Sequence, residues 1–177
     1  MSKKPQPTHA FTIQSPAINR MLAMDITITP VNDTSKAFKT KGIWDTGATG
    51  TVITENVAKA IGLQPTGMTK VNTASETGRD TQTYLVDIFL KPDVRVHGIE
   101  VTCGTIDTRN GFDCLIGMDI ITMGDFAITN LDSKTCMSFR IPSQHRVDFV
   151  EVTKRQSDRL VNPKLHSKFT PPKKKRK

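Results

Sequence analysis

An aspartate stands between an apolar run and a turn of small residues in the stretch Gly42-Ile43-Trp44-Asp45-Thr46-Gly47-Ala48-Thr49. The apolar run predicts a buried strand that carries the Asp45 carboxylate at its end. Gly47 lets backbone N–H groups approach that carboxylate, and Thr46 supplies a hydroxyl for a hydrogen bond to a neighbouring backbone. A carboxylate held in this way can activate water when a second one lies nearby, because such a pair shares one proton. Asp-Thr-Gly alone is also a common turn sequence, so further motifs must decide.

A second motif lies downstream, at Asp113-Cys114-Leu115-Ile116-Gly117-Met118-Asp119-Ile120-Ile121. Its apolar residues predict a short buried strand that ends at Gly117, and Asp119 is expected to cap the helical turn that follows. Between the two motifs, alternating segments flank the polar tip Ser75-Glu76-Thr77-Gly78-Arg79-Asp80, which predicts a β-hairpin.

In this order the three features resemble those of the retropepsin-like aspartic proteases, the single-domain relatives of pepsin. The residues of the motifs are most similar to those of the bacterial-type members. The resemblance covers residues 18–142. It implies an all-β fold, a closed β-barrel with one or two short helices, that is active as a two-fold homodimer. The hairpin tip departs from the glycine-rich tip of viral flaps, which leaves its contacts with a substrate open.

The resemblance also implies a role for each residue of the motifs. The catalytic group comprises Asp45, Thr46 and Gly47, with Thr46 forming hydrogen bonds across the subunit interface. The substrate-binding group comprises Ala48, Thr49, Gly50, Leu115 and the hairpin residues Ala74, Ser75, Glu76, Thr77 and Gly78. The group that supports the site comprises Trp44, Ile116, Gly117, which packs under the active-site loop, and Asp119.

The mechanism requires two aspartates, and the sequence contains no second Asp-Thr-Gly or Asp-Ser-Gly. We therefore expect a homodimer in which each chain contributes Asp45. The predicted activity is an aspartic endopeptidase that hydrolyses peptides or proteins and uses no metal and no cofactor. Two alternatives remain open: a non-catalytic peptide-binding or assembly module of the same fold, and a nucleic-acid-associated protein that acts through its basic tail.

The charge of the chain is concentrated at one end. The 177 residues carry a formal net charge of +8, and residues 141–177, with 11 Lys and Arg against 3 Asp and Glu, account for all of it. The final basic run comprises Lys173, Lys174, Lys175, Arg176 and Lys177. It predicts a weak polyanion contact, or a nuclear localisation signal as the alternative to a cytoplasmic location.

Three scattered cysteines argue against a disulfide framework and for a reducing compartment. Cys114 is expected to be a small core residue, and His97 an exposed bystander. No apolar run approaches the length of a membrane span and no secretory signal is visible, so no membrane partner is expected.

Four segments are predicted along the chain. Residues 1–17 form a flexible leader, and 18–142 form the protease domain, in which Thr54 caps a short helix and Asp87 lies on the polar side of a strand. Residues 143–159 form an extension in which Val147, Phe149 and Val150 are interpreted as an edge strand. Residues 160–177 form a basic, disordered tail.

Overall fold

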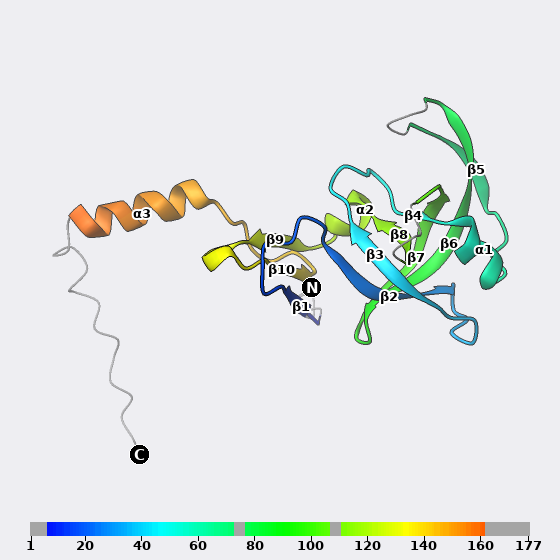
Figure 1. Ribbon diagram of the computed structural model, residues 1–177, viewed down its shortest axis with the longest axis horizontal. Coiled ribbons are helices and arrows are strands. Elements are labelled where there is room, and N and C mark those ends of the chain that lie inside the picture. The colour runs from blue at the N-terminus through cyan, green and yellow to red at the C-terminus, as the bar shows by residue number, and fades with distance from the viewer. Residues whose placement is uncertain (1–6, 73–76, 107–110, 162–177) are drawn as a thin grey trace, which may run out of the picture. The chain divides into compact units, whose positions relative to one another are not determined.

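A computed structural model describes residues 7–72, 77–106 and 111–161, the last four of these by their backbone alone. The chain divides into two compact units, 1–144 and 145–177. The first unit contains two β-sheets, and the second contains a single described helix (Figure 1).

The larger sheet closes into a six-stranded barrel. Its strands follow the order β2-β3-β8-β4-β7-β6, and pairing of β2 with β6 completes the ring, while β5 continues the sheet beyond β6 (Figure 1). The strands are β2 (Ala23–Pro30), β3 (Phe38–Trp44), β4 (Val52–Ile53), β5 (Gly67–Val71), β6 (Arg79–Lys91), β7 (Val94–Cys103) and β8 (Phe112–Ile116). The predicted all-β barrel is therefore confirmed.

Two parallel pairs within the barrel bring the two sequence motifs together. β3 pairs with β8 in parallel, with Trp44 opposite Ile116, and β4 pairs with β7 in parallel. Because parallel strands end at the same edge of a sheet, the residues after Trp44 and Ile116 emerge side by side. The Asp45 loop and Gly117 are neighbours for this reason.

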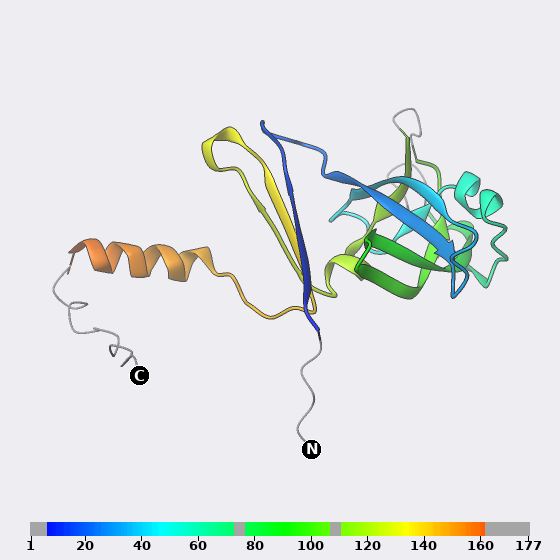
Figure 2. The same ribbon diagram turned by 90° about the horizontal axis from the view of Figure 1, so that it is seen from below.

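A smaller, three-stranded sheet pairs a strand from the beginning of the first unit with two strands from near its end. It has the order β1-β10-β9, formed by β1 (His9–Gln14), β9 (Asp125–Thr129) and β10 (Cys136–Ile141). Figures 1 and 2 both show β1 alongside β10. The prediction of a flexible leader over 1–17 is wrong for residues 9–14, because Phe11 and Ile13 alternate with polar residues and pack against the core.

Among the described residues, three short helical segments connect strands of the first unit. They are α1 (Glu55–Ala60), α2 (Met118–Ile121) and the 3₁₀ turn η2 (Leu131–Ser133). In the second unit, Phe149 and Val150, which were interpreted as part of an edge strand, belong instead to the helix α3 (Phe149–Val161), and Val147 precedes that helix without being in a strand. Glu151 and Arg155, one helical turn apart, form an ion pair of 3.6 Å, a pattern that suits a helix and not a strand. The predicted disordered tail over 160–177 is wrong for residues 160–161, whose backbone belongs to α3, and residues 162–177 lie outside the described residues.

Trp44 joins the two sheets of the first unit. Its indole stacks on Phe126, with ring centroids 5.1 Å apart and planes at 18°, and it meets Phe139 at 5.0 Å. The side chain is 6% exposed and belongs to the hydrophobic core with the barrel interior. The residue before the aspartate is thus fixed by aromatic packing, which gives the Asp45 loop a rigid base.

Candidate active site

The Asp45 loop begins where β3 ends. The Gly47 N–H donates to Asp45 Oδ1 at 2.8 Å, and the Ala48 N–H donates to the Asp45 carbonyl at 3.3 Å, which closes a tight turn. Asp45 is half-buried, while Thr46, Gly47 and Thr49 are exposed. The carboxylate therefore has one internal donor among the described residues and remains accessible from solvent.

Both ends of the loop are anchored on the segment that connects β8 to α2. The Asp45 N–H donates to the Ile116 carbonyl at 3.0 Å, and the Met118 N–H donates to the Ala48 carbonyl at 2.8 Å. These two backbone bonds hold the first motif against the second one, so the loop geometry depends on both.

Gly117 lies directly beneath Gly50. A Cβ at position 117 would come within 2.5 Å of the Gly50 carbonyl carbon and oxygen, a separation that no side chain can occupy. The backbone of the loop approaches β8 this closely only because residue 117 is glycine. The resemblance assigned Gly117 to the support of the active-site loop, and the structure places it against the backbone of Gly50.

Asp119 bonds to Thr51, the residue that follows the loop, and it is not the cap of α2 that was predicted. Gly117 is the N-cap of α2, and Asp119 lies inside its first turn. Its carboxylate accepts hydrogen bonds from the Thr51 N–H at 2.8 Å and the Thr51 hydroxyl at 2.7 Å. The same hydroxyl oxygen accepts the Gly117 N–H at 3.1 Å. Thr51 is a supporting residue that the sequence analysis missed, although it directly follows the loop.

Asp113, near the start of β8, also has a structural role. It accepts the Thr54 hydroxyl at 2.7 Å and the Thr40 hydroxyl at 3.0 Å, one on each carboxylate oxygen. Thr54 is the N-cap residue of α1, as predicted, but it makes no side-chain cap bond, because its hydroxyl is directed to Asp113. Asp113 is 8% exposed. Its carboxylate, like that of Asp119, has both oxygens engaged and is not a partner for Asp45 within one chain.

The other predicted site residues are distributed as follows. Leu115 is half-buried in β8, opposite Ile43 of β3 on one side and Val52 of β4 on the other. Gly78 has a left-handed backbone with φ of 69°, and its N–H donates to Asn72 Oδ1 at 2.9 Å, beside Thr77 in the hairpin connection. Ala74, Ser75 and Glu76 lie outside the described residues.

Comparison with known proteins matches this arrangement to one family. The family described as gag-polyprotein putative aspartyl protease matches residues 17–123, which include both motifs and most of the barrel. The chain belongs to this family. No curated protein matches it.

Solved structures similar to this chain include three proteases or protease-like domains. A retropepsin-like aspartic protease from Rickettsia conorii is 17% identical with a TM-score of 0.49, and the match covers 78% of this chain and 99% of that one. A foamy viral protease-reverse transcriptase in complex with an RNA/DNA hybrid is 25% identical with a TM-score of 0.39, covering 56% and 11%. The retroviral protease-like domain of Ddi1 from Leishmania major is 15% identical with a TM-score of 0.36, covering 58% and 78%.

Cys114, which directly follows Asp113 in the second motif, is not placed as a reactive nucleophile. Cys114 is fully buried in β8, and burial, followed by the neighbouring Asp119 and Asp113, raises the pKa of its thiol far above the ordinary value. A thiol in such surroundings is inert. Within the described ranges, no three His, Cys, Asp or Glu residues are grouped as metal ligands would be.

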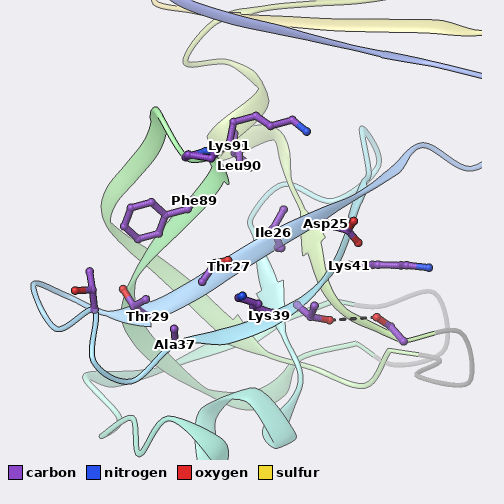
Figure 3. Close-up of a pocket in the computed structure, with 14 residues that line it drawn as sticks. Asp25, Ile26, Thr27, Thr29, Ala37, Lys39, Lys41, Phe89, Leu90 and Lys91 are labelled. Atoms are coloured by element: carbon purple, nitrogen blue, oxygen red, sulfur yellow. Dashed lines mark hydrogen bonds between the residues drawn. The ribbon is translucent and has the colours of Figure 1, made fainter.

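A hollow of about 820 Å³ lies away from the Asp45 loop. Figure 3 shows it against β2, β3 and the end of β6, where Thr27, Lys39 and Phe89 contribute to its lining. None of residues 45–50 lines this hollow. The hollow is therefore separate from the candidate site at the Asp45 loop.

Asp87 forms a cluster that the sequence analysis missed. It was placed on the polar side of a strand, yet it is 0% exposed and accepts the N–H groups of Asn32 at 3.0 Å and Gly98 at 2.8 Å. Arg95 pairs with it, and His97 Nδ1 lies 2.8 Å from Asp87 Oδ1, so His97 is exposed, as predicted, but is not a bystander. Burial by itself raises the pKa of Asp87, but these four donors outweigh it and hold the pKa below its ordinary value.

Proposed function

We propose that this chain is an aspartic endopeptidase whose active species is a homodimer with one Asp45 from each subunit. The observation that carries the proposal is the difference between Asp45 and its neighbouring carboxylates. Asp119 has both oxygens bonded to Thr51, and Asp113 has both bonded to the hydroxyls of Thr54 and Thr40. Asp45, by contrast, is half-buried and receives a hydrogen bond only from the Gly47 N–H among the described residues. Asp45 is therefore the carboxylate available for chemistry, and the second one must come from another copy.

The proposed reaction is hydrolysis of a peptide bond by water. Two Asp45 carboxylates on a two-fold axis share one proton, because two like charges at close range are not both ionised. The ionised carboxylate accepts a proton from the attacking water, and the protonated one donates to the carbonyl oxygen of the substrate. A tetrahedral intermediate forms, and its collapse releases the amine after a proton returns to the nitrogen. No covalent intermediate with the enzyme is required.

The exposed part of the loop supports an assignment of the remaining roles. The Thr46 side chain is exposed and makes no hydrogen bond to other described residues, so we propose that its hydroxyl bonds to the partner's loop. Ala48, Thr49 and Gly50 then lie along the substrate, which binds as an extended strand. We assign the covering of the cleft to the hairpin of β5 and β6, whose exposed strand β5 is free for such contacts.

The cellular setting is proposed from the thiols. Cys103, Cys114 and Cys136 are all free cysteines. Free thiols in this number support a reducing compartment, and we propose the cytoplasm. The basic run Lys173–Lys177 supports a weak contact with polyanions, and a nuclear location is the alternative.

The decisive experiment compares the wild type with Asp45→Asn on a diverse peptide library between pH 4 and pH 8, over a series of protein concentrations. We expect Asp45→Asn to remove cleavage, by about a thousandfold or more, since the general acid and base are both lost. Asp93→Asn changes an exposed carboxylate, 71% exposed, and is the matched control that should cleave normally.

The same proteins test the dimer. Cleavage by the wild type should rise more steeply than linearly with concentration, and an excess of Asp45→Asn should suppress it by forming mixed dimers. Cleavage that is linear in concentration and indifferent to added Asp45→Asn would overturn the shared site. Specific peptide binding without cleavage at any pH would favour a non-catalytic module of the same fold.

A further inference from the structure

The helix α3 (Phe149–Val161) has one apolar side and one charged side. At 100° per residue, Phe149, Val150 and Val152 fall on one arc of the helix, together with the uncharged Thr153, Gln156 and Ser157. The charged residues Glu151, Lys154 and Arg155 fall on the opposite arc. The pattern is that of an amphipathic helix.

The apolar side of α3 is open to water. Phe149 is 69% exposed, Val150 64% and Val152 45%. A helix of 13 residues is marginal in water unless its apolar side packs against something. We therefore expect a binding partner to cover these exposed side chains.

Charge identifies the chemistry of that occupant. Residues 141–177, the part of the sequence that contains α3, carry 11 Lys and Arg against 3 Asp and Glu and are strongly cationic. A second copy of α3 would bring its own 141–177 segment, which also carries a formal net charge of +8, and be repelled. A nucleic acid would satisfy the charge through its phosphates but would leave Phe149, Val150 and Val152 uncovered.

We propose that α3 lies on the surface of an anionic lipid bilayer. Phe149, Val150 and Val152 enter the boundary between headgroups and acyl chains, while Lys154, Arg155 and the basic residues that follow bind the lipid phosphates and carboxylates. Within the described residues, no helix is long and apolar enough to cross a membrane. The sequence-based expectation of no membrane partner considered only such spans, and a helix that lies on the surface needs none.

The test is co-sedimentation of the full chain with vesicles. We expect binding to phosphatidylcholine vesicles that contain phosphatidylserine, little binding to pure phosphatidylcholine, and a loss of binding at high salt. The helical signal in circular dichroism should rise when anionic vesicles are added. These readouts do not involve cleavage, so they are independent of the proposed protease activity.

Two variants separate the apolar contribution from the electrostatic one. Phe149→Ser combined with Val152→Ser should weaken vesicle binding by about tenfold or more, because the buried apolar area is lost while every charge is kept. Ile18→Ser removes a comparably exposed apolar side chain, 53% exposed, from the other unit and should leave binding unchanged. As a second readout, Phe149→Trp should shift its fluorescence to the blue on anionic vesicles, against a constant background from the buried Trp44.

Three results would overturn the proposal. Equal vesicle binding by the double serine variant and the wild type would show that the contact is electrostatic only. A helical signal that rises with protein concentration in the absence of lipid would identify a second copy as the occupant. Tight binding of single-stranded RNA, with no binding to anionic vesicles, would identify a nucleic acid.

Discussion

Asp45 and Asp87 are two carboxylates on the same barrel with opposite surroundings. Asp87 is 0% exposed and receives hydrogen bonds from four residues, two of them through backbone N–H groups that fix turns. Asp45 is half-buried, and within the described part of the chain only the Gly47 N–H donates to its carboxylate. Hydrogen bonds from its own chain occupy both oxygens of Asp87, whereas they leave the Asp45 carboxylate largely free.

This contrast separates a structural carboxylate from a reactive one. A saturated, buried carboxylate contributes to stability, because its removal leaves several donors without an acceptor. A carboxylate with few internal donors contributes little to folding, but it is free to bind water, substrate or a second carboxylate. Stability and activity should therefore respond to the two aspartates in opposite ways, and four measurements test this.

The largest loss of stability is expected for Asp87→Ala. The substitution leaves the N–H groups of Asn32 and Gly98 unsatisfied and deprives Arg95 of its partner, at a cost of about 3 kcal/mol. The free energy of unfolding in urea measures this, with Asp93→Ala as a matched exposed control that should change it by less than about 0.5 kcal/mol. A cost at Asp87 equal to that of the control would remove the distinction between the two carboxylates.

A loss of about 2 kcal/mol is expected for Gly117→Ala, because the new Cβ overlaps the Gly50 backbone and the loop has to move. Unlike Asp87→Ala, this variant should also reduce cleavage, since the displaced loop carries Asp45. Gly67→Ala is the control for stability alone, because Gly67 lies in the hairpin assigned to cover the cleft: its Cβ would meet only the Thr83 hydroxyl, at 3.2 Å. Full cleavage by Gly117→Ala would mean that the close contact beneath the loop does not position Asp45.

A smaller effect is expected from pH. The pKa of Asp87 is lower in the folded chain than its ordinary value of 3.8, so the unfolded chain binds the proton more readily. The contribution of Asp87 to stability is therefore complete above about pH 5 and is lost as the pH falls through 3.8 and below. At constant protein concentration, the difference in unfolding free energy between the wild type and Asp87→Asn should shrink over this interval. A difference that stays constant or grows with acid would contradict the direction of the pKa shift.

The sequence predicted the features that depend on neighbours along the chain. The apolar strand before Asp45, the strand before Gly117 and the short helix after Thr54 were all visible as local patterns. The family followed from the order of those patterns and not from any one of them.

What the sequence did not reveal depends on contacts between distant segments. Asp87 alternates with buried residues and so looked exposed, but the turns at Asn32 and Gly98 fold over it, and no local pattern encodes that closure. The hydroxyl of Thr54 was assigned to a helix cap and instead binds Asp113, which β8 brings alongside. β1 did have a local signal, the alternation of Phe11 and Ile13, but it is short and its pairing partner β10 is at the far end of the unit.

The smallest change in stability is expected where the change in activity is largest. Asp45→Asn keeps the shape of the side chain and its acceptor toward the Gly47 N–H, so the unfolding free energy of the monomeric chain should change by less than about 0.5 kcal/mol. In the proposed dimer two Asn side chains can pair through a donor and an acceptor where the two carboxylates share a proton, so the variant dimer should dissociate about as readily as the wild type. Urea unfolding and sedimentation equilibrium on the same samples measure the two quantities separately. If Asp45→Asn lowers stability as much as Asp87→Ala does, Asp45 is a structural carboxylate, and the loss of cleavage in that variant no longer identifies it as the reactive group.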